Sequence, residues 1–396
     1  MSQLAAGRPD VAGEAPPQEN SAARPRILLL STSLGMGGAD RQILYLAHAL
    51  IAQNYEVRLV CMTPPEEMGR QALAGGLPIT SLEMQRGQAD WRSFQRFVTL
   101  LQTWQPHVLT SFMYHANLLG RLAGKWAGVP LVITSIRSER NGSAARDWLM
   151  RLTNWMDHSC TTNSQQVADS LMSRGLLSKR KLRVIPNGVD IAALAASPAD
   201  RARIREELGL GPTGFLWVAI GRLWEQKDYP TLLRAFPGLA PSARLAIAGR
   251  GPLLDELGRQ ADQLGIGPRV TFLGVRRDIG ALLSAADALV LPSAWEGMPN
   301  VVMEALAAAK PVVATQVGGV AELVQPGKSG FLAPAGDAEA LSRAMAELMS
   351  LSDEQRQQMG LYGRNHIAAH YGLATMAERW SALYRELMSQ KGWSPR

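Results

Sequence analysis

Cysteine is scarce in this 396-residue chain, and long apolar stretches are absent. Cys61 and Cys160 are the two cysteines, and each stands at the end of an apolar run, where a small buried side chain fits. Two cysteines cannot cross-link a chain of this length, which excludes a disulfide-framed secreted protein and favours a reducing, cytoplasmic setting. No apolar stretch approaches the ~18 residues that a membrane-spanning helix needs.

Metal-ligand patterns and a signal sequence are missing as well. No Asp-x-Asp occurs, and the cysteines and six histidines show no ligand spacing, so we expect neither a metal nor another cofactor. Residues 1–24 are rich in Ala, Pro, Glu and Gln and lack an apolar segment. This composition predicts a flexible tail and no signal peptide.

A strong charge of one sign is also lacking. The chain has 41 Lys or Arg and 34 Asp or Glu, a formal net charge of +7. Residues 1–195 contain 20 basic and 14 acidic side chains, whereas residues 196–396 contain 21 and 20, so the excess lies in the first half. Such a modest excess argues against a nucleic-acid binder and suits an anionic partner or a membrane surface.

What the sequence does contain is a regular alternation of short apolar runs and amphipathic helical segments. The alternation begins near Arg26, pauses at Pro186-Asn187-Gly188 and then starts again. Strand and helix in alternation indicate parallel sheets with helices on both faces. We therefore predict an α/β protein with two doubly wound domains, residues 25–195 and 196–372, and a final helical segment, residues 373–396, whose packing the sequence does not determine.

A glycine-rich loop follows the first predicted strand. The run Gly35-Met36-Gly37-Gly38-Ala39-Asp40 leads into a helix, where free amide groups and a partial positive charge favour an anionic ligand. The run lacks the third glycine of the dinucleotide fingerprint. An ordinary tight turn between strand and helix is the alternative interpretation.

The second half contains a more informative set of charged residues. Arg222 follows a predicted strand and Lys227 comes five residues later, which suits a diphosphate. Glu296 lies in a Gly- and Pro-flanked loop and Glu304 in the helix that follows, on the order of 10 Å away. Retaining glycosidases hold their carboxylates about 5–5.5 Å apart, so this spacing better suits the two ends of a nucleotide sugar. Two solvated helix glutamates are the alternative.

These motifs together resemble the retaining glycosyltransferases of family 4, which have the two-domain GT-B fold. The resemblance spans roughly residues 26–385 and rests on the Glu296-x7-Glu304 element and the glycine-rich loop, where Asp40 replaces the more usual Glu. Further matching blocks are Gly221-Arg222 with Lys227, Gly249-Arg250-Gly251-Pro252, Phe272-Leu273-Gly274, Val317-Gly318-Gly319 and Asn187-Gly188-Val189-Asp190.

The resemblance implies a role for each matching residue. Arg222 and Lys227 would neutralise the departing diphosphate, Glu304 would bind the ribose, and Glu296 would bind the transferred sugar. His115 matches a histidine near donor sugar and acceptor, with helix capping or packing as its alternative. Further donor contacts would come from Gly37, Gly38, Gly221, Val275, Arg276, Gly297, Met298, Pro299, Asn300 and Val301.

Aromatic and basic residues alternate in the first half, where the acceptor is expected to bind. Trp91, Arg92, Phe94, Arg96 and Phe97 stand at helical spacing, with Trp104 beyond. Arg137, Arg140, Arg146 and Arg151, with Trp148 among them, add positive charge. One interpretation is a packed face with solvated arginines on the other side. The other is contact with an anionic membrane and a lipid-linked acceptor, a polyprenyl-diphosphate sugar or lipopolysaccharide.

We therefore expect a retaining, metal-independent glycosyltransferase of cell-surface polysaccharide biosynthesis. It would move a hexose from a nucleotide sugar, a UDP-sugar, to a saccharide or lipid-linked saccharide. Its place would be the cytoplasm, with peripheral contact at the inner face of the membrane. A nucleotide-sugar epimerase on the same fold and a non-catalytic nucleotide-sugar-binding protein are the alternatives.

Overall fold

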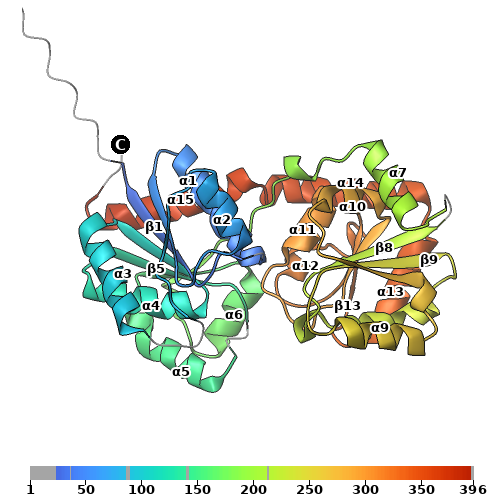
Figure 1. Cartoon of the computed structure of the whole chain (residues 1–396), viewed down its shortest axis with the longest axis horizontal. Helices are drawn as coiled ribbons and strands as arrows, with labels where there is room; N and C mark the ends of the chain where they lie inside the picture. The colour runs from blue at the N-terminus through green and yellow to red at the C-terminus, as the bar shows by residue number, and fades with distance from the viewer. Residues whose placement is uncertain (1–23, 36, 86–89, 140–141, 212–213, 394–396) are drawn as a thin grey trace, which may run out of the picture.

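The computed structural model describes residues 24–35, 37–85, 90–139, 142–211 and 214–393. The predicted tail lies outside these ranges except for its last residue, and so does Arg140. Two parallel sheets stand side by side, each with helices on both faces (Figure 1). Within the described residues, no helix combines the length and the apolar character that crossing a bilayer requires.

The first half is a seven-stranded parallel sheet in the order β3-β2-β1-β4-β5-β6-β7. Its strands are β1 (Arg26–Ser31), β2 (Glu56–Cys61), β3 (Ile79–Ser81), β4 (Val108–Phe112), β5 (Leu131–Ile136), β6 (Ser159–Thr162) and β7 (Leu182–Val184). Its helices are α1 (Gly38–Ala52), α2 (Glu67–Ala74), α3 (Trp91–Trp104), α4 (Tyr114–Trp126), α5 (Ala144–Thr153), the short 3-10 helix η1 (Asn154–Met156) and α6 (Gln165–Ser173).

The second half is a six-stranded parallel sheet in the order β10-β9-β8-β11-β12-β13. Its strands are β8 (Phe215–Ile220), β9 (Ala243–Ala248), β10 (Val270–Gly274), β11 (Ala288–Leu291), β12 (Val312–Thr315) and β13 (Gly330–Ala333). The helices from η2 onward are η2 (Ala192–Leu194), α7 (Pro198–Glu207), η3 (Glu225–Lys227), α8 (Tyr229–Ala235), η4 (Phe236–Gly238), α9 (Leu254–Gln263), η5 (Gly267–Arg269), α10 (Ile279–Ala285), α11 (Asn300–Ala307), α12 (Val320–Leu323), α13 (Ala338–Ser350), α14 (Asp353–His370) and α15 (Leu373–Gln390).

The central strands are buried along their whole length because helices cover both faces of each sheet. Every residue of β4, β5, β11 and β12 is buried. Continuous burial without alternation is typical of strands inside a parallel α/β sheet. The predicted class, an α/β protein with two doubly wound Rossmann-like sheets, is confirmed.

The chain crosses between the halves twice, and the two crossings lie together. Val189 pairs with Gly372 in an isolated bridge, and the Val189 amide donates to the Tyr371 carbonyl at 2.9 Å. After this second crossing, α15 packs on the first half, where Trp380 and Tyr384 are buried against the sheet (Figure 1). The final helix, which the sequence did not place, therefore completes the core of the first half.

Helix α7 lies where the chain enters the second half. Ser197 is its cap, and Pro198 stands in its first turn. Serine at the cap and proline at the first helical position are favoured starts, and they outweigh the weak periodicity of this segment.

Candidate active site

The strand order reverses at one place in each sheet, and the predicted site residues follow these strands. In the first half β1 and β4 are neighbours, and the glycine loop follows β1 while His115 follows β4. In the second half β8 and β11 are neighbours, with Arg222 after β8 and Glu296 after β11. Ligands of open parallel sheets bind where the order reverses, at the carboxyl ends of the strands.

One cavity of about 1280 Å³ lies between the two halves. It brings together all fifteen residues that the sequence singled out. They are Gly37, Gly38, His115, Gly221, Arg222, Lys227, Val275, Arg276, Glu296, Gly297, Met298, Pro299, Asn300, Val301 and Glu304. The structure thus gathers them at one site, while the role of each stays a prediction.

Glu296 is held by two donors at the base of the cavity. Lys227 Nζ lies 2.5 Å from Glu296 Oε1, and Ser293 Oγ donates to the same oxygen at 2.7 Å. The Glu296 residue is only 6% exposed. A buried carboxylate with these two partners is fixed in position, so the alternative of a solvated glutamate is wrong here.

Glu304 is buried as well, and its partner comes from the other half of the molecule. The guanidinium of Arg41, on α1, lies 2.5 Å from Glu304 Oε1. Burial raises the pKa of Glu304, and the nearby Arg41 charge lowers it in part. The sequence interpretation did not include Arg41, although its position directly after Asp40 at the start of α1 was a signal.

Arg222 is an exposed cation that lines the cavity. Its guanidinium lies over the Trp224 ring, 5.5 Å from the ring centre. Across the cavity, burial raises the pKa of Asp40 to about 6, although the Gly37 and Gly35 amides that donate to its carboxylate and the Arg222 charge lower it. Asp40 therefore ties the glycine loop together and faces the cation of the second half.

The backbones of the two halves come into close contact at Gly297. A Cβ on Gly297 would lie 2.1 Å from the Arg137 carbonyl oxygen, which no side chain tolerates. Gly318 has a φ of +50°, and a Cβ there would lie 2.2 Å from the Glu296 carbonyl. Glycine is thus required at both positions because backbone approaches backbone around the loop that carries Glu296.

Amide side chains link the halves beside this contact. Asn187 donates to Asn300 Oδ1 at 2.6 Å, and Asn300 in turn donates to the Gly38 carbonyl at 3.0 Å. Gln42 bonds both the carbonyl and the amide of Gly188. The glycine loop is therefore not merely a turn within its own half. The sequence interpretation missed Gln42, which carries no motif signal.

Val275 and Arg276 line the cavity on the side opposite α11. The Arg276 guanidinium is turned away to Asp278, with bonds of 2.8 and 2.7 Å, and also pairs with Glu207. The neighbouring Arg277 pairs with Glu67 of the first half. The Arg276 side chain is therefore held by carboxylates within the second half.

His115 reaches the cavity from the start of α4. Its residue is exposed, its ring meets Tyr114 edge-on, and burial of part of the ring together with the Arg146 charge lowers its pKa. Met113, just before α4, has a φ of +74°, a strained value for a side chain of this size. Backbone strain of this kind is typical of functional loops. Here it stands directly before the first turn of α4, whose residues Tyr114 and His115 line the cavity.

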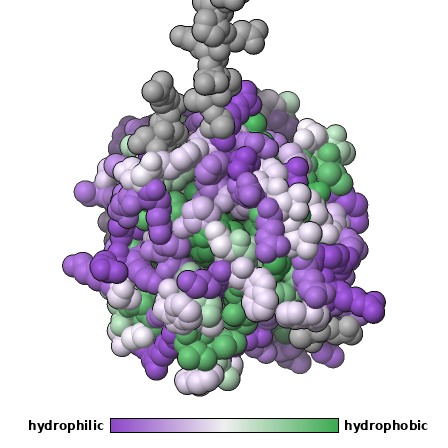
Figure 2. Space-filling model, turned by 90° about the vertical axis from the view of Figure 1, so that its left-hand side faces the viewer, coloured by the Kyte–Doolittle hydropathy of each residue, from purple (hydrophilic) through white to green (hydrophobic). Residues whose placement is uncertain are grey.

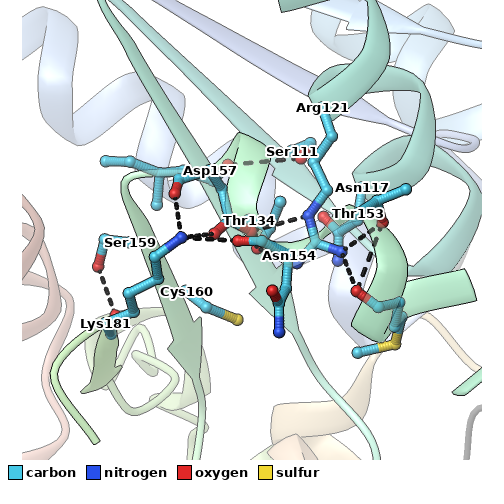
Figure 3. A network of polar contacts seen from close by, with 12 residues as sticks. Ser111, Asn117, Arg121, Thr134, Thr153, Asn154, Asp157, Ser159, Cys160 and Lys181 are labelled. Carbon is cyan, nitrogen blue, oxygen red and sulfur yellow. Dashed lines mark hydrogen bonds and ion pairs between the residues drawn. The ribbon is translucent and has the colours of Figure 1, made fainter. Parts of the chain in front are cut away.

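A buried polar network supports the first-half wall of the cavity (Figure 3). Asp157, fully buried, accepts from Arg121 at 2.8 Å and from the Thr134 hydroxyl at 2.9 Å. Lys181 lies 3.4 Å from the same carboxylate, and Arg121 also donates to Thr153. The network ties α4 to the end of α5 and to two strands, so both helices present fixed side chains. The sequence gave no motif for it.

Metal-ligand clusters are not found in the described part of the chain. Within residues 24–393, apart from the undescribed gaps, no three His, Cys, Asp or Glu side chains are grouped so that they could hold a metal ion.

Known proteins share this architecture and these sequence blocks. Residues 36–193 match the family model "Glycosyltransferase Family 4", and residues 200–366 match "Glycosyl transferases group 1". The chain is 27% identical over 317 residues to an Escherichia coli UDP-Gal:α-D-GlcNAc-diphosphoundecaprenol α-1,3-galactosyltransferase, covering 76% of this chain and 81% of the relative.

Two further similarities agree with this assignment. A GDP-mannose-dependent α-(1-6)-phosphatidylinositol monomannoside mannosyltransferase of Mycolicibacterium smegmatis is 32% identical over 283 residues, covering 67% of this chain and 72% of the relative. The crystal structure of Anabaena HepE in complex with UDP has a TM-score of 0.81 at 21% identity, covering 91% of this chain and all of that one. Fold, cavity and sequence blocks agree, and the chain therefore belongs to glycosyltransferase family 4.

Proposed function

We propose that the protein is a retaining, metal-independent glycosyltransferase that moves a hexose from a UDP-sugar to a lipid-linked saccharide. The observation that carries this proposal is the second-half wall of the cavity. There Glu296 and Lys227 form a pair, and Glu304 stands on the following helix. A nucleotide sugar offers a sugar hydroxyl, a diphosphate and a ribose to these three groups in turn.

In the proposed reaction, the cations of the cavity stabilise the leaving group. As the bond between the anomeric carbon and the diphosphate oxygen breaks, negative charge grows on the diphosphate. Arg222, Lys227 and residues at the start of α11 line the same cavity. In the proposed reaction the two cations and the helix amides stabilise that charge. This positive set supports a reaction that needs no metal ion.

Retention of configuration follows from attack on the face that the diphosphate leaves. The acceptor hydroxyl bonds to the anomeric carbon, and a diphosphate oxygen takes the proton of that hydroxyl, so no side-chain nucleophile is required. Glu296, already bound to Lys227 and Ser293, holds a sugar hydroxyl and fixes the orientation of the ring. His115 lies at the opposite wall, beside the incoming acceptor.

UDP and a diphosphate-linked lipid are the substrates that two relatives favour. The E. coli relative is named for UDP-galactose and a diphosphoundecaprenol acceptor, and the Anabaena structure contains UDP. The M. smegmatis relative is named for GDP-mannose, so the test includes donors with either base. An acceptor of this kind places the enzyme at the inner face of the cytoplasmic membrane, in cell-surface polysaccharide synthesis.

The test is nucleotide release from a panel of UDP- and GDP-sugars, with and without polyprenyl-diphosphate saccharides, in buffer containing a metal chelator. We expect UDP release that depends on the acceptor and persists with the chelator, and an α-linked product by NMR from an α-linked donor. Formation of an epimer without nucleotide release would establish the epimerase alternative. A β-linked product would refute retention, and loss of activity with chelator would refute metal independence.

A further inference from the structure

Large apolar side chains are exposed on the outer end of the first half. Four tryptophans there are 60–69% exposed, although tryptophan is usually buried over most of its surface. Two exposed leucines accompany them. We call this set the tryptophan surface; its members are Trp91, Leu122, Trp126, Trp148, Leu152 and Trp155.

Adjacent elements carry these residues, so they form one surface. Phe94 stacks on Trp91 and meets Trp126 edge-on, which joins α3 to α4. Lys125 of α4 lies over the Trp155 ring, which joins α4 to η1. Trp148, Leu152 and Trp155 follow at spacings of four and three residues, one face of a helix. In Figure 2, which faces this end of the molecule, pale and green side chains lie among purple ones in the lower part.

The charges among these residues are mainly positive. Arg92, Lys125 and Arg151 are exposed, and Arg151 donates to the backbone carbonyl of Arg174. The acidic groups nearby are already paired, Asp90 with Arg96 and Asp147 with Arg174. Exposed tryptophans among cations match the interface of an anionic bilayer, where the rings enter the headgroup region and the cations meet lipid phosphates.

The tryptophan surface continues from the cavity. On α4, His115 and Leu118 line the cavity, and Leu122 and Trp126 follow along the same face of the helix. On α5, Leu149 lines the cavity and Leu152, three residues later, belongs to the tryptophan surface. Apolar residues of α4 and α5 thus continue from the cavity onto the tryptophan surface, which suits an acceptor with a sugar diphosphate at one end and a lipid at the other.

We propose that the tryptophan surface docks the enzyme on an anionic lipid bilayer and guides the lipid of the acceptor past α4 and α5 into the cavity. The docking stands on the exposed residues alone. The path of the acceptor rests on the proposed function. Replacing Trp126 and Trp155 by serine removes two of the exposed rings. The core should stay intact, because both rings lie on the surface.

The test measures co-sedimentation with vesicles of phosphatidylcholine, with and without phosphatidylglycerol. The wild-type chain is expected to bind the vesicles that contain phosphatidylglycerol, with a blue shift of tryptophan fluorescence. The double variant Trp126→Ser with Trp155→Ser should bind about tenfold or more weakly. Leu361→Ser, at an exposed apolar position on α14 of the other half, is the matched control and should bind like wild type. Absence of wild-type binding, or equal binding of all three proteins, would overturn the proposal.

Two further measurements separate this proposal from competing explanations. Sedimentation velocity over a range of protein concentrations detects self-association, and a dimer that the double variant abolishes would assign the surface to a second copy of the chain instead. Activity is then compared on a short-chain, water-soluble acceptor and on a long-chain acceptor in vesicles. The double variant should retain turnover of the first and lose most turnover of the second. Equal loss on both acceptors contradicts docking, whereas inactivity of the wild type on both contradicts the proposed function.

Discussion

The two walls of the cavity differ in how firmly their side chains are held. In the second half Glu296 and Glu304 are each 6% exposed, and each already has a charged partner. In the first half His115 and Met113 are exposed, and the apolar residues of α4 and α5 continue onto an open surface. A fixed wall suits a nucleotide sugar, the class of donor for which both curated relatives are named, and an open wall suits an acceptor, which differs between them.

The largest effect should come from Lys227→Ala, which removes a cation from the fixed wall. We expect kcat for nucleotide release to fall about 100-fold or more, with a much smaller rise in the apparent donor constant, because the charge matters most as the diphosphate departs. Steady-state kinetics with varied donor measure both. Arg277→Ala, which removes a different cation that lines the cavity, is the control. A rise in the donor constant with unchanged kcat would assign Lys227 to ground-state binding.

Glu304→Ala should weaken nucleotide binding and leave the chemistry less affected. Loss of charged hydrogen bonds to the ribose predicts an increase of about 10- to 100-fold in the Kd for UDP. Isothermal titration calorimetry measures this Kd, and unchanged UDP affinity would contradict the ribose role.

Arg41→Gln tests whether the first half restrains the fixed wall. Because Arg41 holds the carboxylate that the ribose is expected to use, its removal should lower the Kd for UDP by about three- to tenfold at pH 8. Titration of the Arg41→Gln and Arg41→Lys variants in parallel measures the effect, and the lysine variant should resemble wild type. Weaker UDP binding by the glutamine variant would show that Arg41 contacts the nucleotide instead.

The smallest expected effect is a pH-dependent change in the free energy of unfolding, caused by Asp40 in the glycine loop. Burial raises the pKa of Asp40 from an ordinary 3.8 to about 6, so the folded chain favours the protonated carboxyl. The stability that this gives is present below pH 4 and is lost as the pH rises through 6. Relative to Asp40→Asn, the wild type should lose about 1 kcal/mol of unfolding free energy between pH 4 and 7.5, a value reduced by solvent at a half-buried site. Urea unfolding at both pH values measures it, and parallel pH profiles would refute the shift.

The sequence predicted the second half of the site better than the first. Glu296, Glu304, Arg222 and Lys227 stand in dense motifs at fixed distances from strand ends, so local spacing sufficed to predict that they line one cavity, while their roles stay predictions. Arg41 and Gln42 were missed because their partners, Glu304 and Gly188, lie far along the chain. The charge on the first half was visible, but the surface that Trp126 and Trp155 share with Lys125 was not, since a packed face and an exposed face have the same helical spacing.

The sequence alone predicted two parallel sheets covered by helices, because apolar strands alternate with amphipathic helices and the alternation pauses once, at Pro186-Asn187-Gly188. It also determined which residues follow the strand ends and therefore enter a site. Tertiary structure alone decided that α15 returns to the first half, where Trp380 and Tyr384 fill its core. It also decided that Arg41 meets Glu304 across the cavity. Both features depend on contacts between residues that are distant along the chain, and the local sequence pattern does not indicate such contacts.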